Sequence, residues 1–186
     1  MPADRKPSLL MHACCAPCST HPVRLMSETH AVVCFFYNPN IQPETEYRRR
    51  KAELVRLLSS WNIPLILGSG DSGPWWSVIR GHEDDPEGGE RCLRCYRLRL
   101  EATAAEAEAR GFDAFATTLT VSPHKNARAI NGIGLDVAKK TGVPFFTAEF
   151  RKRNGFTIAG RISREEGLYR QSYCGCSFSR NGPRPS

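Results

Sequence analysis

The sequence predicts an α/β protein with three layers, in which helices cover both faces of a mostly parallel sheet of about five strands. Two patterns predict this class. Short apolar runs alternate with longer helical patterns through residues 8–146, the order that a parallel sheet with crossover helices requires. The run at residues 31–37 is almost continuously apolar, which is typical of a strand buried on both faces. We therefore expect a single domain over residues 1–186, with its α/β core at 8–146.

The first half of the core is expected to supply three strands, at residues 8–13, 31–37 and 63–67. Pro17 suits the first turn of a helix that ends near Glu28, because the missing N–H of proline costs nothing there. Leucines at helical spacing predict a second helix from Glu44 to Trp61. Cys34 lies inside the second strand, and we interpret it as a core residue because free cysteine packs as a small hydrophobe.

The second half of the core is expected to add two strands, at residues 112–119 and 143–146. A short helix is predicted at residues 75–81. A long helix is predicted at residues 92–110, because it is rich in alanine and is followed by a glycine. A further helix is expected to end near Lys140, before the last strand.

The segment at residues 147–178 differs from the core because it is basic and carries two cysteines near its end. Residues 163–166 have the pattern of a helix start, so we expect this C-terminal segment to be helical. Residues 179–186 are expected to form a disordered tail.

The charge of the chain favours a polyanionic partner. Its 26 Lys and Arg outnumber 19 Asp and Glu, which gives a formal net charge of +7. Nucleic acid is the first candidate, and a merely basic surface is the alternative. No apolar run approaches the length of a membrane span, and the polar start at residues 1–6 does not begin a signal peptide. We therefore expect a cytoplasmic protein with no membrane partner, whose eight cysteines serve as ligands or redox groups rather than as structural disulfides.

Three cysteines, Cys14, Cys15 and Cys18, lie at the expected turn between the first strand and the first helix. In an open parallel sheet this turn lies at the carboxyl edge, where ligands bind. Amide N–H groups and the dipole of the following helix favour thiolate over thiol. The sequence therefore predicts chemistry at this turn. Burial of the thiols as small apolar side chains is the alternative.

Two further cysteine pairs extend this pattern. Cys92 and Cys95 open the long helix, so their thiols can converge with the first three over one edge of the sheet. Two C-x-x-C pairs suit tetrahedral zinc, and an iron–sulfur cubane also takes four thiolates, so the spacing leaves both metals open. Cys174 and Cys176 can close a small, strained disulfide ring, which suits a redox shuttle. A metal half-site or two unrelated thiols are the alternatives for this last pair.

Seven stretches of the chain resemble the short, QueH-type family of epoxyqueuosine reductases. Two of them are His12-Ala-Cys-Cys-Ala-Pro-Cys18 and Leu168-Tyr-Arg-Gln-Ser-Tyr-Cys-Gly-Cys176. In chain order, the matching stretches are residues 12–18, 36–40, 92–98, 117–126, 150–152, 163–165 and 168–176. They cover nearly the whole chain with natural spacing, which is much more specific than any one C-x-x-C pair.

The resemblance implies a fold of the adenine-nucleotide α-hydrolase (HUP) type without its phosphate loop. It implies an oxidoreductase for the last step of queuosine biosynthesis, the reductive removal of the epoxide oxygen of epoxyqueuosine at the wobble position of tRNA. This reaction takes two electrons and two protons, so an external electron donor is also expected.

The resemblance also implies roles for the cysteines. A [4Fe–4S] cluster is expected on the thiolates of Cys14, Cys15, Cys92 and Cys95. Cys18 is expected to bind a second, mononuclear iron beside the cluster. Cys174 and Cys176 are expected to form a redox-active disulfide.

Arginine and lysine are expected to bind the phosphates of tRNA, while the modified base leaves its loop and enters the site. The basic groups expected to do so are Arg48, Arg49, Lys51, Lys125, Arg151, Lys152, Arg153 and Arg170. Tyr169 and Tyr173 are the candidates for stacking on bases. The candidate proton donors are His12, His124, Tyr37 and Tyr173.

Two other functions remain open from the sequence. One is a non-catalytic, zinc-stabilised RNA-binding module, which has no use for Cys174 and Cys176. The other is a thiol–disulfide oxidoreductase that uses Cys15 and Cys18 without a metal.

Overall fold

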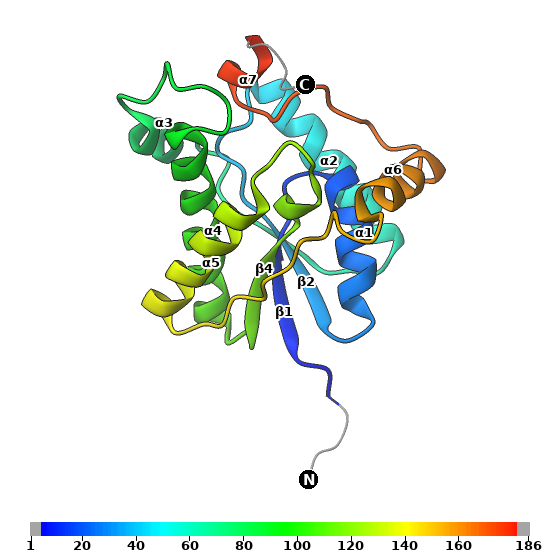
Figure 1. The fold of residues 1–186 in the computed structure, drawn as a ribbon. Helices are drawn as coiled ribbons and strands as arrows, with labels where there is room; N and C mark the ends of the chain where they lie inside the picture. The colour runs from blue at the N-terminus through cyan, green and yellow to red at the C-terminus, as the bar shows by residue number, and fades with distance from the viewer. Residues whose placement is uncertain (1–4, 182–186) are drawn as a thin grey trace.

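The computed structural model describes residues 5–181 and contains a four-stranded parallel sheet in the order β3-β2-β1-β4 (Figure 1). The strands are Ser8–His12 (β1), Ala31–Phe36 (β2), Leu65–Leu67 (β3) and Ala114–Thr117 (β4). In the register of the central strand β1, His12 lies opposite Phe35 of β2 and Thr117 of β4. The carboxyl ends of these three strands therefore meet at one edge of the sheet.

Helices cover both faces of this sheet. They are Ala16–Ser27 (α1), Glu44–Ser60 (α2), Gly73–Ile79 (α3), Glu90–Arg110 (α4), Ala127–Thr141 (α5), Gly155–Glu165 (α6) and Ser177–Asn181 (α7), with a 3-10 helix at Thr118–Val121 (η1). Figure 1 shows α1 and α6 on one side of the sheet and α4 and α5 on the other. The expected three-layer α/β architecture is therefore confirmed. Among residues 5–181, no helix combines the length and the apolar character needed to cross a lipid bilayer.

The two faces of β1 build two separate cores, because successive side chains of a strand point to opposite faces. Leu9 and Met11 pack into the core that lies under α1, α2 and α6. Leu10 packs into the core under α4 and α5. Cys34 on β2 is fully buried in the first of these cores, which confirms its prediction as a core residue.

The predicted fifth strand at residues 143–146 is wrong. This segment forms only an isolated bridge, between Phe145 and Phe115. Pro144 has no N–H to donate to a ladder, although its carbonyl oxygen accepts the N–H of Phe115. The sheet described by residues 5–181 therefore stops at β4 on this side.

The strand predicted at residues 112–119 is too long. Strand β4 ends at Thr117, whose hydroxyl oxygen accepts the N–H of Leu119 and thereby caps η1. This early end matters for the site, because it brings the Thr118 side chain beside Cys14.

The helix start predicted at residues 163–166 is also wrong, because α6 begins at Gly155 and ends at Glu165. The hydroxyl of Ser163 donates to the carbonyl oxygen of Ala159 inside the helix instead of capping a new one. The C-terminal segment is nevertheless helical, as expected. Helix α7 contains residues 179–181 of the expected disordered tail, and residues 182–186 lie outside the described part of the chain.

Candidate functional site

Three thiols converge where β1 passes into α1. Cys15 has an extended backbone and stands at the N-cap of α1, and Pro17 lies in the first turn of the helix, where its missing N–H costs nothing. The sulfur atoms of Cys14, Cys15 and Cys18 all lie within 4.8 Å of one another. Cys14 is held from η1, since the Thr118 hydroxyl lies 3.5 Å from the Cys14 Sγ and accepts the Cys14 N–H. The structure thus brings the predicted trio together.

The three thiols share protons. Hydrogen bonds from the thiols of Cys15 and Cys18 hold the pKa of Cys14 well below its ordinary value. The same hydrogen bond to Cys14 raises the pKa of Cys15 to about 12, and the pKa of Cys18 is also raised. One sulfur is therefore prepared to ionise while its neighbours keep their protons. A bound metal cation would displace those protons, because thiolate is the ligand form. Three converging sulfurs are a soft donor set that suits iron–sulfur clusters or zinc.

Cys92 and Cys95 lie on the first turn and a half of α4, but they do not join this compact group among the described residues. The Cys92 Sγ accepts the N–H of Gly88 at 3.2 Å. Cys95 is buried with Trp75 and Cys176 in a small third cluster. Burial raises the pKa of both the Cys92 and the Cys95 thiols. The four cysteines predicted to bind the cluster are thus divided, with Cys14 and Cys15 in the trio and Cys92 and Cys95 on α4.

Cys174 and Cys176 are directed to different sides of their segment. Cys174 lines the same cavity as the trio, whereas Cys176 packs against Cys95. Gly175 between them has φ +140°, a conformation that other residues rarely adopt. All eight cysteines are free thiols in the structure, so the disulfide implied by the resemblance is not formed here. Burial raises the pKa of Cys176 to about 11.

A cavity of about 390 Å³ lies between the trio and the C-terminal segment. Arg99 of α4 reaches it with only 2% of its side chain exposed, and its Nη2 has no hydrogen-bond partner. Asn40 is 1% exposed and its Oδ1 also lacks a partner. Gln171 donates to the Cys15 Sγ at 2.8 Å, while its own carbonyl oxygen has no partner. These unpaired polar atoms make the cavity a site for a polar group, because buried polar atoms are normally hydrogen-bonded.

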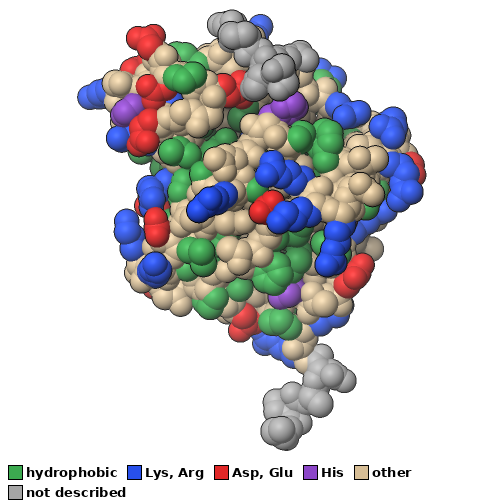
Figure 2. Space-filling model, in the orientation of Figure 1, with side chains coloured by type: hydrophobic (Ala, Val, Ile, Leu, Met, Phe, Trp, Pro, Cys, Tyr) green, Lys and Arg blue, Asp and Glu red, His purple; other side chains and the backbone are tan. Residues whose placement is uncertain are grey.

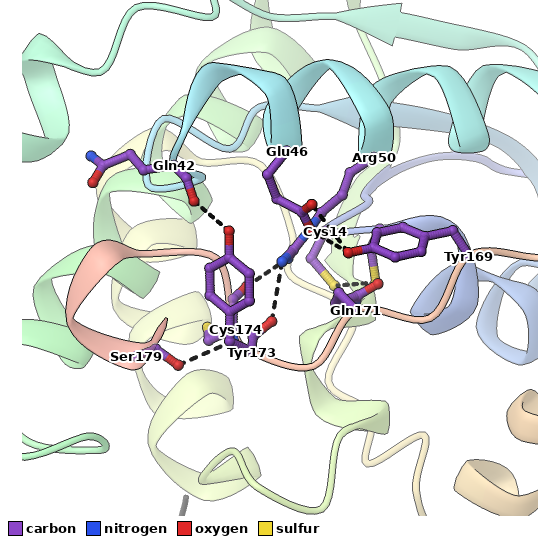
Figure 3. A network of polar contacts seen from close by, with 10 residues as sticks. Cys14, Gln42, Glu46, Arg50, Tyr169, Gln171, Tyr173, Cys174 and Ser179 are labelled. Atoms are coloured by element: carbon purple, nitrogen blue, oxygen red, sulfur yellow. Dashed lines mark hydrogen bonds and ion pairs between the residues drawn. The ribbon is translucent and has the colours of Figure 1, made fainter. Parts of the chain in front are cut away.

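A buried arginine holds the segment that carries Cys174 (Figure 3). The side chain of Arg50 donates to the carbonyl oxygens of Cys174, at 2.8 Å, and Tyr173, at 3.2 Å. It is paired with Glu46 at 2.7 Å, and Glu46 also accepts from the Tyr169 hydroxyl. This network ties α2 to the C-terminal segment.

From the sequence, Arg50 is expected only as part of the basic run at residues 48–51, and its buried role was missed. Its signal is its position on the apolar stripe of α2, between Tyr47 and Leu54, where a cation is out of place unless it is paired.

The predicted basic residues fall into two groups. Lys125 and Arg170 line the cavity. Burial opposes the charge of Lys125, but the negative charge that Cys174, Tyr96 and Cys14 can carry raises its pKa above its ordinary value. The others are not lining residues: Arg48, Arg49 and Lys51 lie on α2, and Arg151, Lys152 and Arg153 precede α6.

Some of the candidate proton donors and stacking residues line the cavity and others do not. His124 and Tyr173 line the cavity, and His12 and Tyr37 do not. Both ring nitrogens of His12 are engaged, by the Thr117 hydroxyl and by the carbonyl oxygen of Tyr37, each at 3.1 Å. Burial lowers the pKa of His12 to about 4, so the ring is neutral near pH 7. A structural role therefore suits His12 better than proton donation.

The space-filling view shows how charge is distributed around this edge (Figure 2). Lys and Arg side chains are spread over the middle and right of the face, across α1, α6 and the chain that leads into α6. Asp and Glu gather at the upper left, over the loop between α3 and α4. The side of the site formed by α6 is therefore the one suited to a polyanion.

Two solved structures have a similar fold. The U34-tRNA thiolase NcsA from Methanococcus maripaludis, solved with its [4Fe-4S] cluster, aligns with a TM-score of 0.62 at 14% identity, over 95% of this chain and 62% of that one. A predicted subunit of tRNA methyltransferase from Methanocaldococcus jannaschii aligns with a TM-score of 0.53 at 12% identity, over 86% of this chain and 89% of that one. These likenesses show that the α/β fold of this chain recurs in both solved structures.

Sequence comparison identifies the family. The family described as Epoxyqueuosine reductase QueH matches residues 9–182. The chain is 38% identical over 180 residues to Epoxyqueuosine reductase QueH of Streptococcus pyogenes, which covers 94% of this chain and 71% of that protein. It is also 38% identical over 175 residues to the protein of the same name from Thermotoga maritima, at 92% and 90% coverage. The Histophilus somni relative is 40% identical over 176 residues. The chain therefore belongs to the epoxyqueuosine reductase QueH family.

Proposed function

We propose that this protein is an epoxyqueuosine reductase, which converts epoxyqueuosine to queuosine at the wobble position of tRNA as the last step of queuosine biosynthesis. The observation that carries the proposal is the cavity, which is lined by both the Cys14–Cys15–Cys18 trio and Cys174. Membership of the family supports it. On the same grounds we propose a single-domain enzyme that acts in the cytoplasm, where tRNA is found.

The cofactor that we propose is a [4Fe–4S] cluster. Its ligands are proposed to be Cys14 and Cys15 from the trio and Cys92 and Cys95 from α4, with Cys18 beside them for a second, mononuclear iron. Converging thiols, one of which already has a lowered pKa, fit such a group. When bound, it supplies single-electron transfer and a Lewis-acidic iron for an epoxide oxygen.

The electrons for the reaction are proposed to come from Cys174 and Cys176. Loss of the epoxide oxygen as water consumes two electrons and two protons and leaves a carbon–carbon double bond. Oxidation of two thiols to one disulfide releases the same number of each, so the two half-reactions balance. An external electron donor is needed to reduce the disulfide after each turnover.

Other residues of the cavity are proposed to position the reacting groups. Arg50 donates a hydrogen bond to the carbonyl oxygen of Cys174 and so positions the Cys174 thiol at the cavity. Arg99 lies there with a buried guanidinium, and a buried cation of this kind stabilises negative charge on nearby sulfurs. His124 and Tyr173, which line the cavity, remain the candidate proton donors.

The test is turnover by the reduced enzyme. After iron-replete, anaerobic purification, the protein is incubated with tRNA that contains epoxyqueuosine, and the digested nucleosides are analysed by mass spectrometry. We expect queuosine from the wild type and from Cys34→Ala, whose thiol lies in the core, but none from Cys174→Ser. A colourless zinc protein without activity would favour the RNA-binding module instead. Turnover of a disulfide substrate without any metal would favour the thiol–disulfide oxidoreductase.

A further inference from the structure

The rim of the cavity carries an exposed aromatic side chain, Phe156. It lines the cavity on the first turn of α6, and 44% of the residue is exposed to solvent. Singly exposed apolar side chains are common, but this ring also lines a cavity that contains thiols, so its position suits contact with a molecule that enters the cavity.

Tight packing fixes the first turn of α6, and with it the place of Phe156. Gly155 is buried, and a Cβ atom added to it would lie 1.7 Å from the carbonyl oxygen of Phe150. Only glycine therefore allows α6 to begin so close to the preceding chain. On the same face of the helix as Gly155, α6 also buries Ala159 and Ile162. The Phe156 ring cannot move into the core without moving the helix, so it is presented at the rim as part of a rigid element.

The surroundings of Phe156 are basic. Lys125 and Arg170 line the same cavity, and Arg153 is exposed just before α6. Glu87 is the one carboxylate among the described lining residues, and the Ser179 hydroxyl binds it at 3.2 Å. An aromatic ring among cations is the combination that binds single-stranded RNA, because bases stack on the ring while phosphates meet the cations.

The two tyrosines expected to stack on bases are already occupied. The Arg49 guanidinium lies 3.4 Å from the ring centre of Tyr169, and the Tyr169 hydroxyl donates to Glu46. The Tyr173 hydroxyl donates to the carbonyl oxygen of Gln42, and Arg50 lies over its ring at 5.0 Å. Both side chains hold the C-terminal segment in place, which leaves Phe156 and the imidazole of His124 as the exposed aromatic rings among the lining residues, and Phe156 as the larger of the two.

We propose that Phe156 is a stacking platform for a base of the tRNA anticodon loop, next to the nucleotide that enters the cavity. The proposal deepens the function proposed above and rests on it for the identity of the RNA. Its occupant is a single-stranded RNA base, chosen because the rim around the ring is cationic. A protein partner, such as the electron donor, is the competing occupant.

The test measures binding without chemistry. Fluorescence anisotropy with a labelled anticodon stem-loop RNA compares the wild type with Phe156→Ala and Phe156→Tyr. We expect Phe156→Ala to bind about tenfold more weakly and Phe156→Tyr to bind like the wild type, since either ring can stack. The matched control is Phe146→Ala. Phe146 is 36% exposed and packs against His30, which precedes β2 at the amino edge of the sheet, away from the cavity.

Two further measurements separate stacking from charge. The salt dependence of binding should keep the wild-type slope in Phe156→Ala and become shallower by about one in Arg170→Ala, which removes a cation. Two further RNAs each lack one base, either the base before or the base after the wobble position. With one of these two RNAs, the wild type and Phe156→Ala should bind with equal affinity, because the base that stacks on Phe156 is missing.

Each outcome decides the question. If Phe156→Ala binds the RNA as tightly as the wild type does, the stacking proposal is wrong while the proposed function stands, and a protein partner becomes the favoured occupant. If the wild type itself does not bind the stem-loop, both proposals are overturned. If neither abasic RNA removes the difference, Phe156 acts by supporting the rim, and the stacking proposal is wrong.

Discussion

The guanidinium of Arg50 donates a 2.8 Å hydrogen bond to the carbonyl oxygen of Cys174, which lies 124 residues later in the chain. Arg50 is 2% exposed and paired with Glu46, so this contact is made by a buried ion pair. Such a pair contributes little net stability compared with apolar residues, but removal of one partner leaves an uncompensated charge. Its use here is to place a flexible cysteine segment against a rigid helix.

Replacement of Arg50 should therefore destabilise the protein. We expect Arg50→Met to lower the free energy of unfolding by about 3 to 5 kcal/mol, because the largely buried carboxylate of Glu46 would lose the cation that compensates its charge. Urea denaturation measures the change, and the alkylation rate of Cys174 in the folded protein should rise. The control is Arg48→Met, an exposed residue of the same helix that pairs with Glu44, for which we expect less than about 0.5 kcal/mol. Equal effects of the two variants would contradict this account.

Gly175 is required by its backbone. Its φ of +140° is rarely adopted by other residues, and an added Cβ would lie 3.0 Å from Ile41 Cγ1 and 3.1 Å from Asn40 Nδ2. Gly175→Ala should lower the free energy of unfolding by about 1 to 3 kcal/mol. Gly132→Ala is the contrasting variant, because Gly132 lies within α5 with open space around it. It should stabilise the protein by about 0.5 to 1 kcal/mol, as alanine favours helices. Thermal or urea unfolding gives both values.

Metal content should depend on the trio and not on the core cysteine. In protein purified anaerobically after iron-replete expression, Cys14→Ser and Cys15→Ser should lose most of the bound iron and the broad absorption near 400 nm. Cys34→Ala should keep both, because Cys34 is fully buried in the core away from the trio. Chelation of the metal from the wild type should produce the same loss. Iron that survives both serine substitutions would place the metal elsewhere.

His12 should make stability depend on acid pH. Burial lowers its pKa from 6.5 to about 4, so below pH 6.5 the unfolded chain binds a proton that the folded protein refuses. Stability is therefore fully present above pH 6.5 and falls as the pH drops from 6.5 to 4, by about 3 kcal/mol in total from this group. Urea titrations across this range measure the slope. His12→Gln should be less stable near neutrality but have a shallower slope between pH 4 and 6.5; an unchanged slope would assign the effect to other groups.

Local sequence patterns were sufficient for much of the fold. Apolar runs located β1, β2 and β3, and the proline and alanine signals located α1 and α4, because buried strands and helices have characteristic periods. The pattern was insufficient at residues 143–146, where an apolar run with a proline makes only one bridge. It was also insufficient in α6, where the close approach of Gly155 to Phe150, rather than a capping motif, decides where the helix begins.

The sequence by itself determined the spacing of the cysteines, and from it came the prediction of their chemistry. The trio, the C-x-x-C pair and the C-x-C pair were predicted to be ligands or redox groups, because closely spaced thiols are typical of metal and redox sites.

The tertiary structure alone decided which of these groups share a cavity. It placed Cys174 in the same cavity as the trio, tied Arg50 to the Cys174 carbonyl oxygen, and exposed the Phe156 ring at a site where two tyrosines had been expected. These relationships join residues more than a hundred positions apart. They depend on side-chain packing and on the pairing of buried charges, which no local period in the sequence records.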